Sequence, residues 1–114
     1  MANTFTRTTK SSLSTADVTS SSLTDVLTAG STATLIILSV LISNKTGSNA
    51  NANIYLYTSS GDDTYLLRNA PVPAGSSLEM ISGSKLIMVA NDVLRASADA
   101  ATSLDITISY LQQT

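Results

Sequence analysis

The segment "TLIILSVLIS", residues 34–43, is the most apolar stretch of a chain that is otherwise rich in serine and threonine. From Leu35 to Ile42 it spans eight residues and contains Ser39, whereas a helix that crosses a bilayer needs about 20 apolar residues. The length therefore predicts a buried strand and excludes a membrane anchor.

Regular alternation along this strand places Leu35, Ile37 and Leu41 on one face, with Ser39 as the polar member of that set. The other face carries Ile36, Leu38, Val40 and Ile42. A two-layer sandwich covers only one face of a strand, so the other face needs a loop, a crossover or a second subunit. We assign the second set to the core or to an oligomer interface.

The composition around this strand predicts an all-β protein. The chain has 114 residues, which suits one domain spanning 1–114, and 19 Ser plus 16 Thr favour strands and turns over long helices. The segments "SLDITISYLQ" (103–112) and "NANIYLYTSS" (51–60) alternate as strands do, and the second puts Ala52, Ile54 and Leu56 opposite Asn53, Tyr55 and Tyr57.

Five shorter apolar runs have strand length: "LTDVLTA" (23–29), "TYLLRN" (64–69), "SSLEMIS" (76–82), "KLIMVA" (85–90) and "VLRASA" (93–98). Turn-forming residues separate them at "NKTGSN" (44–49), "SSGDD" (59–63), "APVPAGS" (70–76) and "SGS" (82–84). This spacing predicts an antiparallel β-sandwich of eight or nine short strands, with a jelly roll as one arrangement. Pro71, Pro73 and Gly75 indicate an extended crossover between sheets.

The N-terminal segment "NTFTRTTKSSL", residues 3–13, alternates Phe5, Arg7 and Thr9 with threonines. We expect residues 1–13 to be an edge strand or an extended arm, with Phe5, Arg7 and Lys10 as partner contacts. The start of the chain lacks the apolar core of a signal peptide, so we expect synthesis and folding in a cytoplasm.

Catalytic and cofactor chemistry finds little support in the sequence. Cysteine and histidine are absent, which removes thiolate and imidazole nucleophiles, His-dependent triads and nearly every zinc site. With 12% charged residues and a net charge of −2, a nucleic-acid partner is disfavoured. We expect no enzyme activity, no cofactor and no metal; the enzyme alternative, an acid-dependent hydrolase, would need two facing carboxylates in a cleft.

Three local patterns each have a functional and a structural interpretation. Asp62 and Asp63 follow Gly61 and either bind Ca²⁺ or form a turn; the turn is favoured because the Asp-x-Asp-x-Asp spacing is missing. Asn44 matches a glycosylation acceptor, but a turn is again favoured. The four tyrosines are either a carbohydrate-stacking platform or aromatic side chains with hydroxyls in water, and the second is favoured: Tyr55, Tyr57, Tyr65 and Tyr110.

The segments 71–79, 85–89, 90–92 and 103–111 follow the order "PIPAGSSLE", a lysine-led apolar strand, "AGD" and "SLDVTVSYLE". "ISNKTGSNANANIYL" (42–56) likewise matches "LANTTGSAVTVTVYL". Through these segments, over about residues 34–111, the chain resembles small virion proteins of tailed bacteriophages, particularly those of marine and cyanobacterial phages. Asn91 stands where those proteins have a turn glycine, a mild change because Asn tolerates the left-handed conformation.

The resemblance implies a β-sandwich present in many copies and no catalytic motif. It implies a capsid decoration (cement) protein in the virion, with itself, as a homo-oligomer and specifically a trimer, and the major capsid protein as partners, and with no nucleic acid or membrane. A tail, collar or baseplate component is the nearest alternative. A carbohydrate- or receptor-binding β-domain is the other, since it would use the tyrosines.

Overall fold

The computed structural model describes residues 3–80 and 85–114, which form nine strands and one 3₁₀ helix. The elements are β1 (Asn3–Lys10), η1 (Ser22–Thr24), β2 (Asp25–Thr28), β3 (Thr34–Asn44), β4 (Ala50–Tyr57), β5 (Thr64–Val72), β6 (Ser77–Met80), β7 (Leu86–Met88), β8 (Val93–Ala98) and β9 (Leu104–Gln113). The predicted all-β antiparallel sandwich is confirmed. The predicted turn at 82–84 lies outside the described residues.

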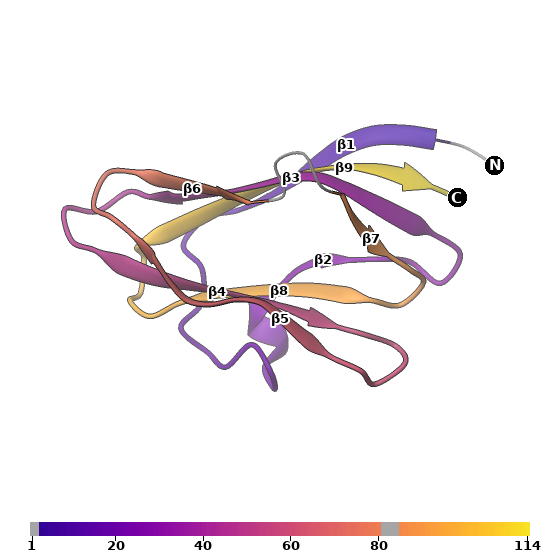
Figure 1. Cartoon of the computed structure of the whole chain (residues 1–114), viewed down its shortest axis with the longest axis horizontal. Helices are drawn as coiled ribbons and strands as arrows, with labels where there is room; N and C mark the ends of the chain where they lie inside the picture. Colours follow the sequence, from indigo (N-terminus) through magenta and orange to yellow (C-terminus); the bar gives the residue numbers. More distant parts are fainter. Residues whose placement is uncertain (1–2, 81–84) are drawn as a thin grey trace.

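Strand pairing is nested about the middle of the chain. β1 pairs with β9, β2 with β8, β3 with both β6 and β7, and β4 with β5, all antiparallel. The chain thus forms one long antiparallel hairpin that reverses at residues 58–63. This hairpin is rolled up, so that the pairs β1–β9 and β3–β6 lie in one layer and the pairs β2–β8 and β4–β5 lie in the other (Figure 1). This pairing is that of a jelly roll.

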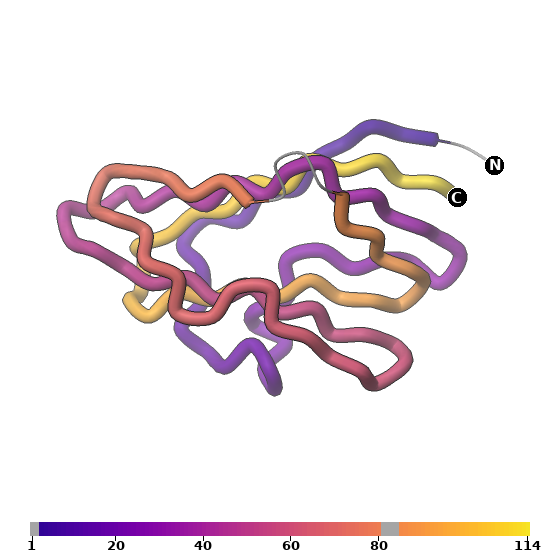
Figure 2. Tube along the Cα trace, in the orientation of Figure 1, coloured from indigo at the N-terminus to yellow at the C-terminus, as the bar shows by residue number. Residues whose placement is uncertain are grey.

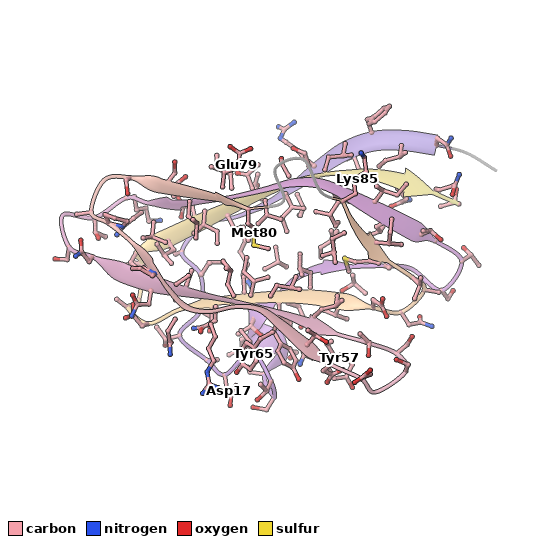
Figure 3. The ribbon with its side chains drawn as sticks, in the orientation of Figure 1. Asp17, Tyr57, Tyr65, Glu79, Met80 and Lys85 are labelled. Carbon is pink, nitrogen blue, oxygen red and sulfur yellow. The ribbon has the colours of Figure 1, made fainter. Side chains whose placement is uncertain are left out.

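The two layers are the β3 sheet and the β4 sheet. The β3 sheet has the order β1-β9-β3-β6, with β7 also paired to β3, and the β4 sheet has the order β2-β8-β4-β5. The core lies between them and draws on the inward-facing residues of both sheets, which Figure 3 shows filling the space between the ribbons. Its largest fully buried members from the longer strands are Leu35, Ile37, Ile42, Ile54, Leu94, Leu104, Ile106 and Ile108.

β3 interrupts its alternation at Leu38. On β9, Tyr110 pairs with Ile37 and the next residue, Ser109, pairs with Ser39, so Leu38 is an extra residue in a β-bulge. The bulge changes which residues face inward, because alternation restarts one residue later. Before it the buried residues are Leu35 and Ile37, and after it they are Val40 and Ile42.

The prediction that Ile36, Leu38, Val40 and Ile42 share one face is therefore wrong. Val40 and Ile42 are fully buried in the core, whereas Ile36 and Leu38 are half-buried. β6 and β7 pair with β3 on opposite sides of Leu38, β6 with residues 40–43 and β7 with residues 35–37.

The predicted crossover is confirmed. Residues 73–76 connect β5 in the β4 sheet to β6 in the β3 sheet, and Gly75 has a φ of +66°. Pro71 lies in β5, which is an edge strand and can spare a ladder donor.

Residues 3–10 form an edge strand that pairs with β9 along its whole length and are not a free arm. The two ends of the chain lie side by side, and β1 extends past β2 of the opposite layer (Figures 1 and 2). Residues 3–7 are consequently exposed on both sides of the strand. Among the described residues, no helix is long and apolar enough to span a membrane.

Candidate functional site

Aromatic and basic side chains gather on the face of the β4 sheet that points away from the core. The ring centroids of Tyr55 and Tyr65 lie 5.0 Å apart with an edge-to-face angle of 71°. The guanidinium of Arg68 lies 5.3 Å from the Tyr65 ring centroid, and that of Arg95 lies 4.4 Å from the Tyr57 centroid. The cluster thus combines edge-to-face aromatic packing with two cation–π contacts.

These tyrosines share a face because β4 alternates. Ile54 and its neighbours at 52 and 56 face the core, which confirms the predicted division of the strand and sends Tyr55 and Tyr57 outward. β5 adds Tyr65 directly opposite Tyr55. Tyr110 does not join them, since it lies on β9 in the other sheet and packs against the core.

The segment before η1 folds over part of this face, as Figure 1 shows. The side chain of Arg95 donates from Nε to Asp25 Oδ1 at 2.8 Å and from Nη1 to the carbonyl of Val18 at 3.3 Å. Val18 is buried against the sheet, and the amide of Ala98 donates to the carbonyl of Ser14 at 3.0 Å. These contacts hold residues 14–18 on the sheet.

A hollow of about 330 Å³ lies between this segment and the sheet. We call it the Asp17 hollow; residues 15–18, Asn53, Tyr65, Arg68, Asn69 and residues 97–99 line it. Figure 3 shows Asp17 and Tyr65 on this side of the molecule, away from the core. Its volume is at the small end of the range for small-molecule sites, about 300–1,000 Å³.

The polar groups of the Asp17 hollow are held by neighbouring hydrogen bonds. Asn53 donates from Nδ2 to Ser97 Oγ at 3.2 Å and accepts at Oδ1 from the amide of Asn69 at 2.9 Å. Asp99 accepts from the amide of Asn51 at 2.8 Å. The hollow is therefore lined by fixed hydrogen-bonding groups, which suits a polar ligand of about one sugar ring.

Asp17 brings a carboxylate to the hollow. The backbone amide and then the hydroxyl of Thr19 donate to Asp17 Oδ1, at 2.9 and 2.8 Å, and they lower the pKa of this carboxyl below its ordinary value of 3.8. An ionised carboxylate accepts hydrogen bonds, so Asp17 can bind donor groups of a ligand in the hollow.

The side chain of Asp63, at the end of the 58–63 turn, is joined by a hydrogen bond to that of Tyr55 on β4. Asp63 accepts from the amide of Thr58 at 2.8 Å and from the Tyr55 hydroxyl at 3.2 Å. Burial and this contact with Asp63 raise the pKa of Tyr55 above its usual value. Asp63 thereby closes the turn, as the turn interpretation predicted, and no cluster of three metal-ligating side chains occurs within residues 3–80 and 85–114.

Asn44 is also a structural residue of its turn. It is 3% exposed, its Nδ2 donates to the carbonyls of Ser48 and Val72, and its Oδ1 accepts from the amide and hydroxyl of Thr46. The turn interpretation of "NKT" is confirmed.

Of the N-terminal residues predicted to contact a partner, Phe5 and Arg7 are exposed on β1. Lys10 differs, because its Nζ donates to the carbonyls of Leu23 and Asp25, at 2.7 and 3.2 Å, and joins β1 to the opposite layer. Its ammonium group is thus engaged within the protomer.

The sequence interpretation missed two features of this region. Asp92 is 4% exposed and accepts from the amides of Ser59 and Val89, so it joins the 58–63 turn to the β7–β8 turn. The Asp17 hollow was missed because four separate segments build it. The local signal for Asp17 was the Asp-x-Thr spacing, which is typical of a side chain capping its own turn.

Comparisons of this chain with protein-family models, with curated proteins and with solved structures found no match.

Proposed function

We propose that this protein is a non-enzymatic structural component of a bacteriophage virion, and specifically a decoration protein that binds and stabilises the major-capsid lattice as a homo-oligomer. It would be made in the cytoplasm of the bacterial host and reside in the virion. The resemblance of residues 34–111 to small phage virion proteins supports this proposal. The jelly roll supports it more weakly, since viral capsid domains, lectins and cupins all use this topology.

The exposed edge of β1 is the observation that carries the proposal. β1 is the terminal strand of the β3 sheet, is eight residues long, and contains neither proline nor a bulge. Only Arg7 and Lys10 are charged along it, and Lys10 points to the opposite layer. Such an edge offers backbone groups to a strand of another protein.

The position of β1 changes the expected mechanism of attachment. Because residues 3–10 already pair with β9, the N-terminal segment would accept a strand from the capsid protein rather than donate one. β1 would keep its backbone hydrogen bonds to β9 when the capsid strand binds. Binding would therefore neither order nor disorder residues 3–10 appreciably.

Binding to expanded capsids that lack the protein tests this proposal. We expect the chain to cosediment with such capsids, and the double variant Thr4→Lys/Thr6→Lys to bind at least about tenfold more weakly, because lysines on an edge strand block strand addition. The matched control is Ser20→Lys/Ser22→Lys, which makes the same charge change at exposed positions in the turn before η1 and at its first residue. Failure of the unmodified chain to associate with expanded capsids would contradict the decoration role.

A tail, collar or baseplate component is the alternative within the same class of protein. Labelling the protein in imaged particles separates the two roles by position and copy number. Label over the capsid faces supports the decoration role, and label at the tail supports the alternative.

The Asp17 hollow favours a second candidate function, a carbohydrate-binding domain. It brings Tyr65 beside fixed amide, hydroxyl and carboxylate groups, a combination that binds the apolar face and the hydroxyls of a sugar.

A glycan array followed by titration of any hit tests this second candidate. Tyr65→Ala should weaken binding at least about tenfold, since it removes the ring that borders the hollow. Tyr57→Ala removes an equally exposed ring on the same face but outside the hollow, and should leave binding unchanged. An array without hits would count against carbohydrate binding.

A further inference from the structure

The Asp17 hollow borders a β-bulge in the edge strand β5. Arg68 and Asn69 of β5 lie together opposite Asn53 of β4, because the pairing of the two strands shifts by one residue at this point. All three residues line the hollow. Asn69 has a φ of +53°, a conformation that residues other than glycine rarely adopt. Bulges and such conformations recur at binding sites, so this part of β5 is a place to look for a ligand.

Two aspartates of the hollow are fixed through one carboxylate oxygen each. Asp17 accepts at Oδ1 from the amide and the hydroxyl of Thr19, and Asp99 accepts at Oδ1 from the amide of Asn51. Within residues 3–80 and 85–114, no hydrogen bond reaches Oδ2 of either aspartate. Each side chain is therefore held in place by its first oxygen, while its second oxygen can accept from a ligand.

Ser97 and Arg68 supply hydrogen-bond donors to the hollow. Ser97 is 4% exposed, and its Oγ accepts from Nδ2 of Asn53 at 3.2 Å. In the part of the chain that the structure describes, no acceptor takes the hydrogen of this hydroxyl, and neither of the two ion pairs includes Arg68. Buried donors are normally paired, so the Ser97 hydroxyl is placed to donate to a ligand in the hollow.

The charged groups around the hollow disfavour an acidic ligand. Among the described residues that line it, Asp17 and Asp99 carry one negative charge each and Arg68 carries one positive charge, which leaves a net charge of −1. A further negative charge would be repelled overall. A neutral ligand rich in hydroxyls avoids this repulsion, because each hydroxyl can donate to a carboxylate oxygen and accept from a serine or an arginine.

We propose that the Asp17 hollow binds a neutral sugar ring and rejects acidic sugars. The two aspartates accept from hydroxyls of the ring, and Ser97 and Arg68 donate to them. This inference names the ligand class for carbohydrate binding, the second candidate function above, and it rests on that function. The volume of about 330 Å³ admits one ring, so the ligand is a monosaccharide or the terminal residue of a longer glycan.

Nuclear magnetic resonance titration of the ¹⁵N-labelled full chain tests this inference with matched pairs of sugars. The neutral probes are D-glucose and D-galactose. The acidic probes are D-glucuronate and D-galacturonate, which have a carboxylate in place of the exocyclic hydroxymethyl group. We expect at least one neutral sugar, added to about 50 mM, to shift the amide signals of Ser97 and Asn69, and to bind at least about tenfold more tightly than its acidic counterpart.

Removing the two carboxylate charges should remove the discrimination. Asp17→Asn/Asp99→Asn keeps an acceptor at both positions, since an amide oxygen accepts hydrogen bonds as a carboxylate oxygen does. The ratio of the acidic to the neutral dissociation constant should therefore fall to about one. Asp62→Asn/Glu79→Gln is the matched control, because it removes two charges at exposed positions outside the hollow and should leave the ratio unchanged.

Ser97→Ala tests the buried donor. It removes one hydroxyl from the wall of the hollow and should weaken binding of the neutral sugar at least about fivefold, the effect of one hydrogen bond. Circular dichroism and the midpoint of thermal unfolding show whether this variant and the double variants are folded. A folded Ser97→Ala that binds the neutral sugar as tightly as the unmodified chain would contradict the role given to this hydroxyl.

The remaining outcomes separate this inference from the function on which it rests. Acidic sugars that bind as tightly as neutral ones, discrimination that survives Asp17→Asn/Asp99→Asn, or shifts confined to amides outside the hollow would each overturn the inference and leave carbohydrate binding standing. Absence of any shift with all four sugars would also overturn it. A glycan array without hits counts against carbohydrate binding itself, and binding to expanded capsids tests the decoration role independently.

Discussion

Asp105 shows how one side chain joins three segments at the start of β9. Its Oδ1 accepts from Lys45 Nζ and from the amide of Ser12, each at 2.8 Å. The hydrogen bond from Lys45, followed by that from Ser12, lowers the pKa of Asp105 below its ordinary value of 3.8. The ionised form is therefore stabilised by folding.

We predict that Asp105→Asn lowers the free energy of unfolding at pH 7 by about 0.5–1 kcal/mol, a modest value because solvent screens a pair that is more than a third exposed. A depressed carboxyl pKa contributes stability above the unfolded value of 3.8, and this contribution is lost as the pH falls through the folded pKa. Urea unfolding at several pH values should show the difference between variant and unmodified protein shrinking as the pH falls below 3.8.

Asp62→Asn, at an exposed loop position, is the control and should leave stability unchanged across the same range. A deficit of Asp105→Asn that persists undiminished at low pH would contradict this account.

The backbone conformation of single residues was predictable where a turn needs a positive φ, because few residue types other than glycine and asparagine adopt it readily. Asn91 has a φ of +69° and Gly75 of +66°, as expected for a turn asparagine and for the glycine of the crossover. Asp92 was not predictable in this way. Its partners at 59 and 89 are brought to it by the fold, and a solvated aspartate in a turn would have the same sequence.

At the scale of elements, the bulge at Leu38 sets which side chains of β3 enter the core. We predict that deletion of Leu38 is tolerated, because Leu35, Ile37, Val40 and Ile42 would all still face inward in a regular ladder. The cost should not exceed about 2 kcal/mol, the value of one partly buried leucine.

Deletion of Leu41 is the matched control, since it removes the same residue type from the same strand. It shifts the phase after Val40 and turns Ile42 and Asn44 out of the core, so the protein should not fold. Urea unfolding followed by circular dichroism measures both variants. Equal loss of structure in the two would contradict the assigned bulge.

The alternation of apolar and polar residues predicted where the strands lie. It assigned side chains of β3 to the wrong faces because the bulge at Leu38 interrupts the period of two. The available signal was the polarity of Ser39 and Ser43. In an unbroken alternation, Ser39 and Ser43 share the face of Leu35 and Ile37. If the alternation restarts one residue later after Ile37, both serines leave that face and Val40 and Ile42 join it. An unbroken period of two was the simpler assumption, and it assigned Leu41 to the face of Leu35 although Leu41 is 37% exposed.

At the scale of the whole molecule, two layers of antiparallel strands could be predicted but their order could not. Turn spacing reports where the chain reverses, whereas the pairing of β1 with β9 depends on packing between residues about 100 positions apart. The Asp17 hollow is of this kind too, since residues 53, 65, 68–69 and 97–99 meet residues 15–18 only once β4, β5 and β8 have paired and the segment before η1 has folded onto them. Local patterns therefore identified Tyr65 without showing what lies beside it.

The nested pairing predicts an order of folding. β4 and β5 are joined by the short 58–63 turn, so their pairing loses little loop entropy, whereas β1 and β9 close a loop of nearly the whole chain. Pairs should therefore form outward from that turn. Ile54 on β4 and Ile108 on β9 allow a matched test, because both are fully buried isoleucines at opposite ends of this order.

We predict that Ile54→Val and Ile108→Val each lower the free energy of unfolding by about 1 kcal/mol, but act on different rates. Ile54→Val should mainly slow folding, because its contacts are present in the transition state, and Ile108→Val should mainly speed unfolding, because its contacts form later. Stopped-flow refolding and unfolding in urea separate the two effects. If Ile108→Val slows folding as much as Ile54→Val does, the ends of the ribbon pair as early as its middle, and the sheets assemble together rather than outward from residues 58–63.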